Sequence, residues 1–327
     1  MTGGALQDWL APPDPHHEPH KILIKRGVFV DPKRGDRAVP YKIYYPVAHS
    51  LDHLPVVVWS HGLGGSADGA AFLGRFVASH GYVVVNIQHA GTDSALWEGK
   101  PGHPWDIIRA TEIRPEETID RFLDVPFALD CLPGWAAENP DVAGHMNMSC
   151  LGMSGHSFGA YTTQVAAGQM FFDGREGGLR SFRDSRFRAA IAYSPMPACD
   201  TDTGAQFGHR AVYGPIAIPM MYMTGTLDIS PLGGVTVEQR EEPFMHAGAG
   251  GQHLVVLEGG DHMVFAGSRG KLAENPLRHR HEDIIKVLSL AFWDAYLRDD
   301  PAAKAWLCGE GVRDYVGTDA KTNVRLR

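Results

Sequence analysis

Apolar, strand-like runs alternate with helix-like segments along most of this chain. The runs cover residues 54–60, 82–88, 149–154, 188–194, 218–224 and 252–258, and helical spacing occurs at 70–80, 115–132, 159–170 and 281–297. Strands that are apolar almost throughout, with helices between them, are typical of a parallel sheet covered on both faces. Residues 21–30 and 39–46 are predicted to precede the sheet as a hairpin, and Pro126 should kink its helix. The chain is therefore predicted to form an α/β fold with a mostly parallel central sheet.

Length and composition set broad limits on the function. The chain has 327 residues, of which 44% are hydrophobic and 21% charged, and its net charge is −8. These values fit a globular protein with a large core and give no sign of a nucleic-acid surface. No stretch of about 18 apolar residues occurs, so no integral membrane segment is predicted. The N-terminus lacks a basic segment followed by an apolar run, so no signal peptide is predicted and a cytoplasmic location is expected.

Residues 1–20 are predicted to form a flexible arm and residues 21–327 a single domain, because prolines interrupt the segment before residue 21. The arm contains three histidines that could bind a metal, although a mobile segment is the simpler interpretation; they are His16, His17 and His20. None of the four cysteines lies in a C-x-x-C pair, so free thiols are expected, with a disulfide as the alternative in an exported protein. No metal or organic cofactor is predicted, and the oligomeric state stays open.

A G-x-S-x-G run at residues 155–159 follows one predicted strand directly and opens the next predicted helix. In a strand–turn–helix setting this pattern holds a serine oxygen where it can attack a carbonyl carbon. Gly155 and Gly159 leave room for the tight turn. Ser157 is therefore the predicted nucleophile, whereas Ser154, the nearest other serine, should pack within the strand.

A glycine-rich loop, residues 61–65, follows the strand at residues 54–60. Glycines let a backbone approach a ligand closely and turn its N–H groups inward, where they can stabilise the oxyanion of an attacked carbonyl. We expect the two donors to be the backbone N–H groups of Leu63 and Phe158, and the N-terminal dipole of the helix that Phe158 begins should assist them. A simple glycine turn is the alternative interpretation of the loop.

Two later strand ends carry an acid and a histidine. Asp228 follows the strand at residues 218–224, and His262 follows the strand at residues 252–258. His262 is predicted to be the general base for Ser157, and Asp228 to orient it, in the chain order Ser–Asp–His. Asp200 or Asp202, after an earlier strand, could supply the carboxylate instead. The neighbouring Asp261 is too close in sequence to His262 for a good side-chain hydrogen bond.

With these residues in view, the chain resembles α/β-hydrolases. Within them it is similar to predicted dienelactone-hydrolase and platelet-activating-factor-acetylhydrolase-like serine esterases, through residues 60–65, 78–85, 124–130 and 155–159. The resemblance extends over roughly residues 21–300 and implies the α/β-hydrolase fold, with helices on both faces of the sheet. It also supports Leu63 and Phe158 as the oxyanion pair. Dienelactone hydrolases use a cysteine nucleophile, so a serine at position 157 does not imply lactone chemistry.

Three long insertions, residues 92–114, 171–186 and 230–251, are expected to lie over the active edge of the sheet, because strand-to-helix loops emerge there. Polyester hydrolases of the cutinase type share a G-H-S-x-G run but would not need these insertions. Six residues in or near the loops are predicted to line an apolar substrate pocket: Trp97, Trp105, Met196, Met245, Met263 and Val264. The alternative is that the tryptophans only pack the first insertion onto the body.

The predicted function is a serine carboxylesterase that acts on a small-molecule or lipid-like ester without a cofactor. A phospholipid or polyester hydrolase using the same three residues is the alternative, and an amidase would need stronger protonation of its leaving group. A binding protein without activity should lack at least one catalytic element, and none is missing here. A metal-dependent hydrolase should show an H-E-x-x-H or comparable spacing, which the sequence does not contain.

Overall fold

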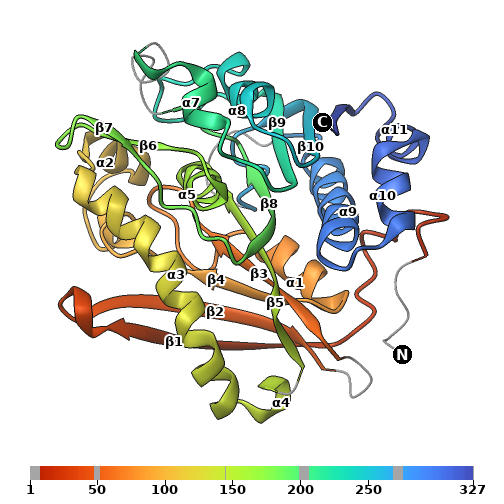
Figure 1. Ribbon diagram of the computed structural model, residues 1–327, viewed down its shortest axis with the longest axis horizontal. Coiled ribbons are helices and arrows are strands. Elements are labelled where there is room, and N and C mark those ends of the chain that lie inside the picture. The colour runs from red at the N-terminus through yellow and green to blue at the C-terminus, as the bar shows by residue number, and fades with distance from the viewer. Residues whose placement is uncertain (1–7, 48–51, 144, 199–205, 268–274, 327) are drawn as a thin grey trace.

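A nine-stranded sheet runs through the centre of the described part of the molecule (Figure 1). The computed structural model describes residues 8–47, 52–143, 145–198, 206–267 and 275–326. The strands lie in the order β1-β2-β4-β3-β5-β8-β9-β10-β11. Their bounds are β1 (Ile22–Asp31), β2 (Arg37–Pro46), β3 (Leu54–Ser60), β4 (Val83–Ile87), β5 (Met146–His156), β8 (Phe187–Tyr193), β9 (Met220–Leu227), β10 (Gln252–Asp261) and β11 (Ala320–Arg325).

The middle of the sheet is parallel, as the sequence predicts. All neighbouring pairs from β4 to β10 run parallel, whereas β1, β2 and β11 pair antiparallel at the two edges. The predicted leading hairpin is the β1–β2 pair. Because the parallel strands share one direction, their carboxyl ends meet at a single edge of the sheet. Binding sites of such sheets lie beyond that edge.

Each parallel strand is apolar throughout because it serves two cores. In β3, Val57 belongs to the core on one face, while Val56 and Val58 belong to the core on the other. The alternation follows from the two-residue period of a strand. Figure 1 shows α3 (Pro115–Glu138) on one side of the sheet, with α1 (Ala71–Ser79) and α9 (Arg278–Leu297) on the other. This arrangement is the predicted α/β fold with helices on both faces.

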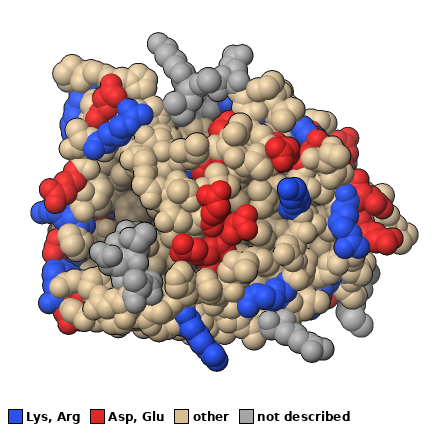
Figure 2. Space-filling model, turned by 90° about the horizontal axis from the view of Figure 1, so that it is seen from above, with Lys and Arg blue, Asp and Glu red and all other residues tan. Residues whose placement is uncertain are grey.

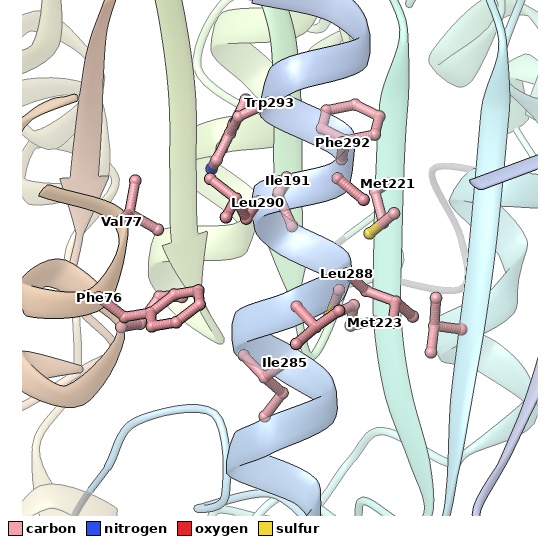
Figure 3. Close-up of a cluster of buried hydrophobic side chains, with 14 of the residues drawn as sticks. Phe76, Val77, Ile191, Met221, Met223, Ile285, Leu288, Leu290, Phe292 and Trp293 are labelled. Atoms are coloured by element: carbon pink, nitrogen blue, oxygen red, sulfur yellow. The ribbon is translucent and has the colours of Figure 1, made fainter. Parts of the chain in front are cut away.

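One of the two large hydrophobic cores surrounds α9. Figure 3 shows Ile285, Leu288 and Phe292 of this helix among side chains from the strands behind it, such as Met221 and Met223. The sequence predicts an amphipathic helix here, but Lys286 is the one residue between 284 and 297 that is not buried. The reason is tertiary, because α1 and α10 (Pro301–Cys308) also pack against α9.

The remaining elements fill the connections between strands. α5 (Phe158–Ala167) follows β5 directly, and α3 continues through Pro126 and Pro133, beyond its predicted end. The insertion at residues 171–186 forms a small hairpin of β6 (Phe171–Asp173) and β7 (Gly178–Arg180). The other helices are α2 (Pro104–Ala110), α4 (Pro140–Ala143), α7 (His209–Tyr213), α8 (Glu242–His246), α11 (Glu310–Val316), and the 3-10 helices η1 (Pro32–Arg34), η2 (Ser94–Leu96) and η3 (Glu238–Glu241).

The described part of the N-terminal segment differs from the free arm that its prolines suggest. Trp9 is only 3% exposed, and its indole Nε1 donates a hydrogen bond of 3.0 Å to the Asp294 carboxylate. Its ring lies 5.1 Å from that of Trp306, between centroids. Burial of an aromatic ring outweighs the disordering effect of the prolines at this point. The segment is anchored to the domain through this residue.

Charge is unevenly distributed over the face in Figure 2. Asp and Glu side chains gather near its middle, and Lys and Arg form small groups toward its margins. Among the described residues this face therefore presents no continuous positive surface.

Candidate active site

Ser157 lies at a strained turn between β5 and α5. Its backbone has φ 56° and ψ −116°, a region that residues with a side chain rarely occupy. Holding such a conformation costs about 1–3 kcal/mol, and strain of this kind concentrates at functional sites. The turn ends the strand at His156 and begins the helix at Phe158. The local geometry is the strand–turn–helix that the G-x-S-x-G run predicts.

Both glycines of the run are required by close backbone contacts. A Cβ at Gly159 would overlap the carbonyl oxygen of Ser60, and one at Gly155 would overlap the carbonyl oxygen of Gly159. The obstructing atoms belong to the backbone, so a rotamer change could not relieve the clash. The run therefore packs tightly against the end of β3, directly before the glycine-rich loop.

The glycine-rich loop lies directly beside Ser157. A Cβ at Gly62 would lie 3.4 Å from the Ser157 Cβ, so the loop backbone passes close to this serine. Gly65 donates its N–H to the Gly62 carbonyl at 3.0 Å, which closes a β-turn with Leu63 and Gly64 at its centre. Gly64 has φ +72°, as the third position of a type II turn requires. The Leu63 N–H has no hydrogen-bond partner within the described residues and is available to a ligand.

His262 and Asp228 meet at the ends of β10 and β9. The His262 Nδ1 lies 2.7 Å from the Asp228 Oδ1, and Asp228 is completely buried. Burial opposes ionisation of the Asp228 carboxyl, but attraction from His262 and Arg240 outweighs it and holds the pKa below its usual value. Thr224 also donates its hydroxyl to this carboxylate at 2.9 Å. The ionised carboxylate fixes the imidazole with a proton on Nδ1.

Ser157 and His262 line one pocket of about 740 Å³, together with Leu63 of the turn. Ser157 and His262 are both described residues, and the structure shows no hydrogen bond between the Ser157 hydroxyl and the His262 imidazole. Such contacts often form only when substrate is bound. The volume lies within the usual range for small-molecule sites. The pocket thus brings a serine, a histidine with a buried carboxylate, and a free backbone N–H to one surface.

Residues 24–99 match a known protein family, described as platelet-activating factor acetylhydrolase, isoform II. The matched segment covers the first strands, the glycine-rich loop and Trp97, and it agrees with the resemblance seen in the sequence. The chain has the α/β-hydrolase fold. The family match indicates a hydrolase that acts on ester bonds. No curated protein matches the chain.

Three of the six predicted pocket residues line this pocket, namely Trp97, Trp105 and Met263. The other three residues do not line this pocket. Val264 is 2% exposed and packs into the core around α9, and Met245 faces solvent with 58% exposure. Met196 lies against the small aromatic cluster beside α5. All three follow strand ends or sit in an insertion, but none of them is among the residues that line the pocket with Ser157.

The first and third insertions meet at this pocket. Trp97 donates its indole N–H to the Gly64 carbonyl at 2.7 Å, so it both lines the pocket and fastens the insertion to the turn. Arg109 of α2 donates to the Pro231 carbonyl at 2.8 Å, which joins the two insertions. Trp97 therefore does what both interpretations of the tryptophans describe: it lines the pocket, and it packs the first insertion onto the body of the domain.

Two buried residues contact the His262–Asp228 pair and were not predicted as site residues. Arg240, which is fully buried, lies 3.0 Å from the Asp228 Oδ1 and 3.3 Å from the His262 Nδ1. Burial lowers the pKa of the His156 imidazole to about 3, so it is neutral, and its Nε2 donates to the His262 carbonyl at 2.8 Å. His156 could have been suspected from its place beside Ser157, whereas no sequence pattern marks Arg240.

The alternative acids Asp200 and Asp202 lie outside the described residues, as does Cys199.

The three described cysteines, Cys131, Cys150 and Cys308, are free and partly buried. Within the described residues no group of three or more His, Cys, Asp or Glu side chains is arranged to hold a metal ion. None of the described helices has the length and apolar character needed to cross a membrane.

Proposed function

We propose that this α/β-hydrolase is a serine carboxylesterase, with Ser157 as nucleophile, His262 as general base and Asp228 as the residue that orients it. The observation that carries the proposal is that Ser157, with its strained backbone, lines the same pocket as a histidine bound to a buried carboxylate. A serine is weakly nucleophilic unless a base takes its proton. The neighbouring imidazole can do so, and its carboxylate partner stabilises the imidazolium that results.

The reaction would proceed in two halves. The Ser157 oxygen attacks the ester carbonyl carbon while its proton passes to the His262 Nε2, and the carbonyl oxygen becomes an oxyanion facing the N–H groups of Leu63 and Phe158. The carbon–alkoxide bond then breaks, and His262 returns the proton to the leaving alcohol. Water attacks the acyl-enzyme in the second half, with His262 again taking and returning the proton, and releases the carboxylic acid.

The lining of the pocket favours uncharged ester groups. Trp97, Trp105 and Leu232 supply apolar surface, and no described lining residue is Lys or Arg. Two carboxylates also line it, those of Asp68 and Glu98. The Arg26 and Lys42 side chains hold the pKa of Asp68 at about 2 and neutralise its charge, whereas Glu98 has no such partner among the described residues. A negatively charged acyl or alcohol group would therefore meet a carboxylate without a compensating cation.

A pair of substrates tests this preference. We expect 4-nitrophenyl butyrate to be hydrolysed with at least about tenfold higher kcat/KM than 4-nitrophenyl hemisuccinate at low salt, a difference of about 1.4 kcal/mol. The acyl groups have similar lengths and differ mainly in a terminal carboxylate. Rates are corrected for spontaneous hydrolysis, and the ratio should narrow in high salt and in Glu98→Gln. Equal or faster hydrolysis of the anionic ester at low salt would contradict the proposed lining.

A phospholipid ester is the second candidate substrate. It is favoured by the match of residues 24–99 to the platelet-activating factor acetylhydrolase family. The matched segment contains the glycine-rich turn and the tryptophan bound to it, but not Ser157, Asp228 or His262. A short-chain phosphatidylcholine with an acetyl group at its second position, compared with 4-nitrophenyl esters from acetate to palmitate, separates this reading from that of a simple carboxylesterase.

Labelling with a fluorophosphonate tests the proposed chemistry directly. The reagent phosphonylates a serine whose proton is removed by a neighbouring base, with loss of fluoride. We expect a single adduct on the peptide that contains Ser157, formed in parallel with the loss of esterase activity, and no effect of EDTA on the rate. Adduct formation elsewhere, or activity that survives complete labelling, would refute the serine mechanism. Activity lost in EDTA would favour a metal-dependent hydrolase instead.

A further inference from the structure

A buried arginine joins the two chain segments that supply the proposed oxyanion donors. Arg121, in the middle of α3, is completely buried. Its guanidinium donates to hydroxyl groups in three different segments, at 2.8 Å to Thr162, 2.9 Å to Thr92 and 2.9 Å to Ser60. It also donates to the carbonyl oxygen of His61.

The four groups that accept hydrogen bonds from Arg121 are all neutral, and the carboxylates of Asp124 and Asp93 attract it only from farther away. Within the described residues no carboxylate lies close enough to form an ion pair with it. Burial lowers the pKa of its guanidinium to about 9, so the group is still charged at neutral pH. Taking a cation out of water without a direct counter-ion is costly, and replacement by an apolar side chain of similar size would often be more stable. Stability alone therefore does not account for an arginine here.

On one side, the guanidinium fixes the turn that presents the Leu63 N–H. The His61 carbonyl, which accepts from Arg121, lies two residues before Leu63. On the other flank, the Gly64 N–H donates to the Thr92 carbonyl at 2.9 Å, and the hydroxyl of the same threonine accepts from Arg121. Both ends of the turn are thus tied, directly or through Thr92, to one planar group.

On its other side, the guanidinium holds the start of α5. Its central carbon lies 4.6 Å from the centre of the Phe158 ring, a cation–π contact. Thr162 lies one helical turn further along, and its hydroxyl also contacts the Phe158 carbonyl at 3.0 Å. The residue after Ser157 is therefore held through its ring and through its carbonyl.

A second buried chain of hydrogen bonds supports Ser60, one of the partners of Arg121. Ser60 Oγ lies 2.9 Å from the His89 Nε2, and the His89 Nδ1 lies 3.1 Å from the Asp124 Oδ2. All three residues are completely buried. Burial and the nearby Arg121 hold the pKa of His89 well below its usual value, so the imidazole is neutral. The order of groups resembles a catalytic triad, but Ser60 and His89 have no exposed surface. This series of hydrogen bonds instead fixes the Ser60 hydroxyl, which accepts a hydrogen bond from Arg121.

We infer that Arg121 is a positioning residue that sets the distance between the N–H groups of Leu63 and Phe158, and so the geometry of the oxyanion hole. The inference rests on the proposed function, because an oxyanion hole matters only if Ser157 attacks a carbonyl. The planar fork of arginine can bind the two segments at fixed angles, which the single ammonium group of a lysine cannot reproduce. Donors that are misplaced stabilise the charged transition state less, while the uncharged substrate is affected little.

Two kinds of variant test the inference. Arg121→Lys keeps the charge and removes the fork. Thr162→Val removes a hydroxyl that contacts Arg121, and Thr163→Val is its matched control. Both threonines are fully buried in α5 and donate to the carbonyl four residues earlier, but only Thr162 touches the guanidinium.

The measurements are kcat, KM and the inhibition constant of an aryl trifluoromethyl ketone. The Ser157 oxygen adds to this ketone while its proton passes to His262, and the resulting oxyanion occupies the hole. Loss of one oxyanion donor costs about 10²–10³ in rate, so a misplaced donor should lower kcat by about 10- to 100-fold. We expect the inhibition constant to rise by the same factor in Arg121→Lys and Thr162→Val, with KM close to that of the wild type. Thr163→Val should keep both values.

Several results would overturn the inference. One is equal kcat and equal inhibition constants in Thr162→Val and Thr163→Val. Another is an Arg121→Lys enzyme that melts at a lower temperature but keeps its kcat and its affinity for the ketone. If Arg121→Lys does not fold, the two threonine variants decide the matter. Failure of a fluorophosphonate to label Ser157 in the wild type would refute the proposed function as well, whereas normal labelling with unchanged variants would refute only the role of Arg121.

Discussion

Replacement of Ser157 by alanine is expected to lower kcat by roughly 10⁶-fold, because the serine oxygen forms the covalent bond to the acyl group. The strained turn should persist, since φ 56° is imposed by the tight contacts of Gly155 and Gly159 with their neighbours. Residual catalysis of roughly 10³-fold over water should remain, from the donors and the pocket alone. The check is steady-state hydrolysis of 4-nitrophenyl butyrate by protein purified free of any wild-type enzyme.

Ser154→Ala is the matched control for this replacement. Ser154 lies three residues earlier in β5, is 3% exposed, and donates its hydroxyl to the Val58 carbonyl at 2.9 Å. Its loss should change the free energy of unfolding by about 1 kcal/mol and leave kcat near that of the wild type. If the Ser154→Ala enzyme were inactive and the Ser157→Ala enzyme active, the nucleophile would be Ser154 and not Ser157.

The second large effect is expected for Asp228→Asn, which should lower kcat by roughly 10⁴-fold. The asparagine amide can donate to the His262 Nδ1, which places the imidazole proton on Nε2, where the serine proton must go. The wrong tautomer therefore removes the base without removing the histidine. KM should change much less than kcat, because Asp228 is completely buried and does not line the pocket.

Stability must be followed in the same variant, because Arg240 loses its charged partner. The guanidinium lies 3.0 Å from the Asp228 carboxylate, and both groups are fully buried. Breaking a buried ion pair typically costs 3–5 kcal/mol, so a lower melting temperature is expected. Rates are therefore measured well below the transition, and circular dichroism shows that the variant is folded.

Asp261→Asn is the control for the choice of acid. Its carboxylate accepts the Met263 N–H at 2.7 Å and the Asn275 amide at 2.7 Å, and an asparagine can keep the first of these contacts. We expect its kcat to fall by less than about tenfold, because this carboxylate does not contact the imidazole. A larger loss in Asp261→Asn than in Asp228→Asn would contradict the assignment.

Local sequence patterns predicted the parts of the fold that depend on local physics. Strands such as residues 54–60 are recognisable because a fully apolar run is stable only between two cores. The G-x-S-x-G run identified a strained turn because only glycine fits the positions at its ends. By contrast, α10, α11 and β11 were not predicted. Their places depend on tertiary contacts: α10 packs on α9, α11 packs on α10 and β11, and β11 pairs with β10.

Side-chain direction in the insertions was not readable from the sequence. Met196, Met245 and Val264 are as apolar as Met263, and all were predicted to line the pocket. In the structure Val264 packs into the core and Met245, on α8, faces solvent, because the packing of the surrounding segments sets the direction of each side chain. Trp97 lines the pocket because a hydrogen bond to Gly64 fixes its ring there.

The sequence by itself determined an alternating, doubly covered sheet, a strained serine turn, and an acid and a histidine at later strand ends in the order Ser–Asp–His. Each of these follows from residues that are neighbours in the chain. Only the tertiary structure decided which buried cations support that arrangement. Arg121 lies 60 positions from His61, and Arg240 lies 22 positions from His262. Which residues these two arginines contact depends on how α3 and the third insertion pack. No spacing along the chain predicts those contacts.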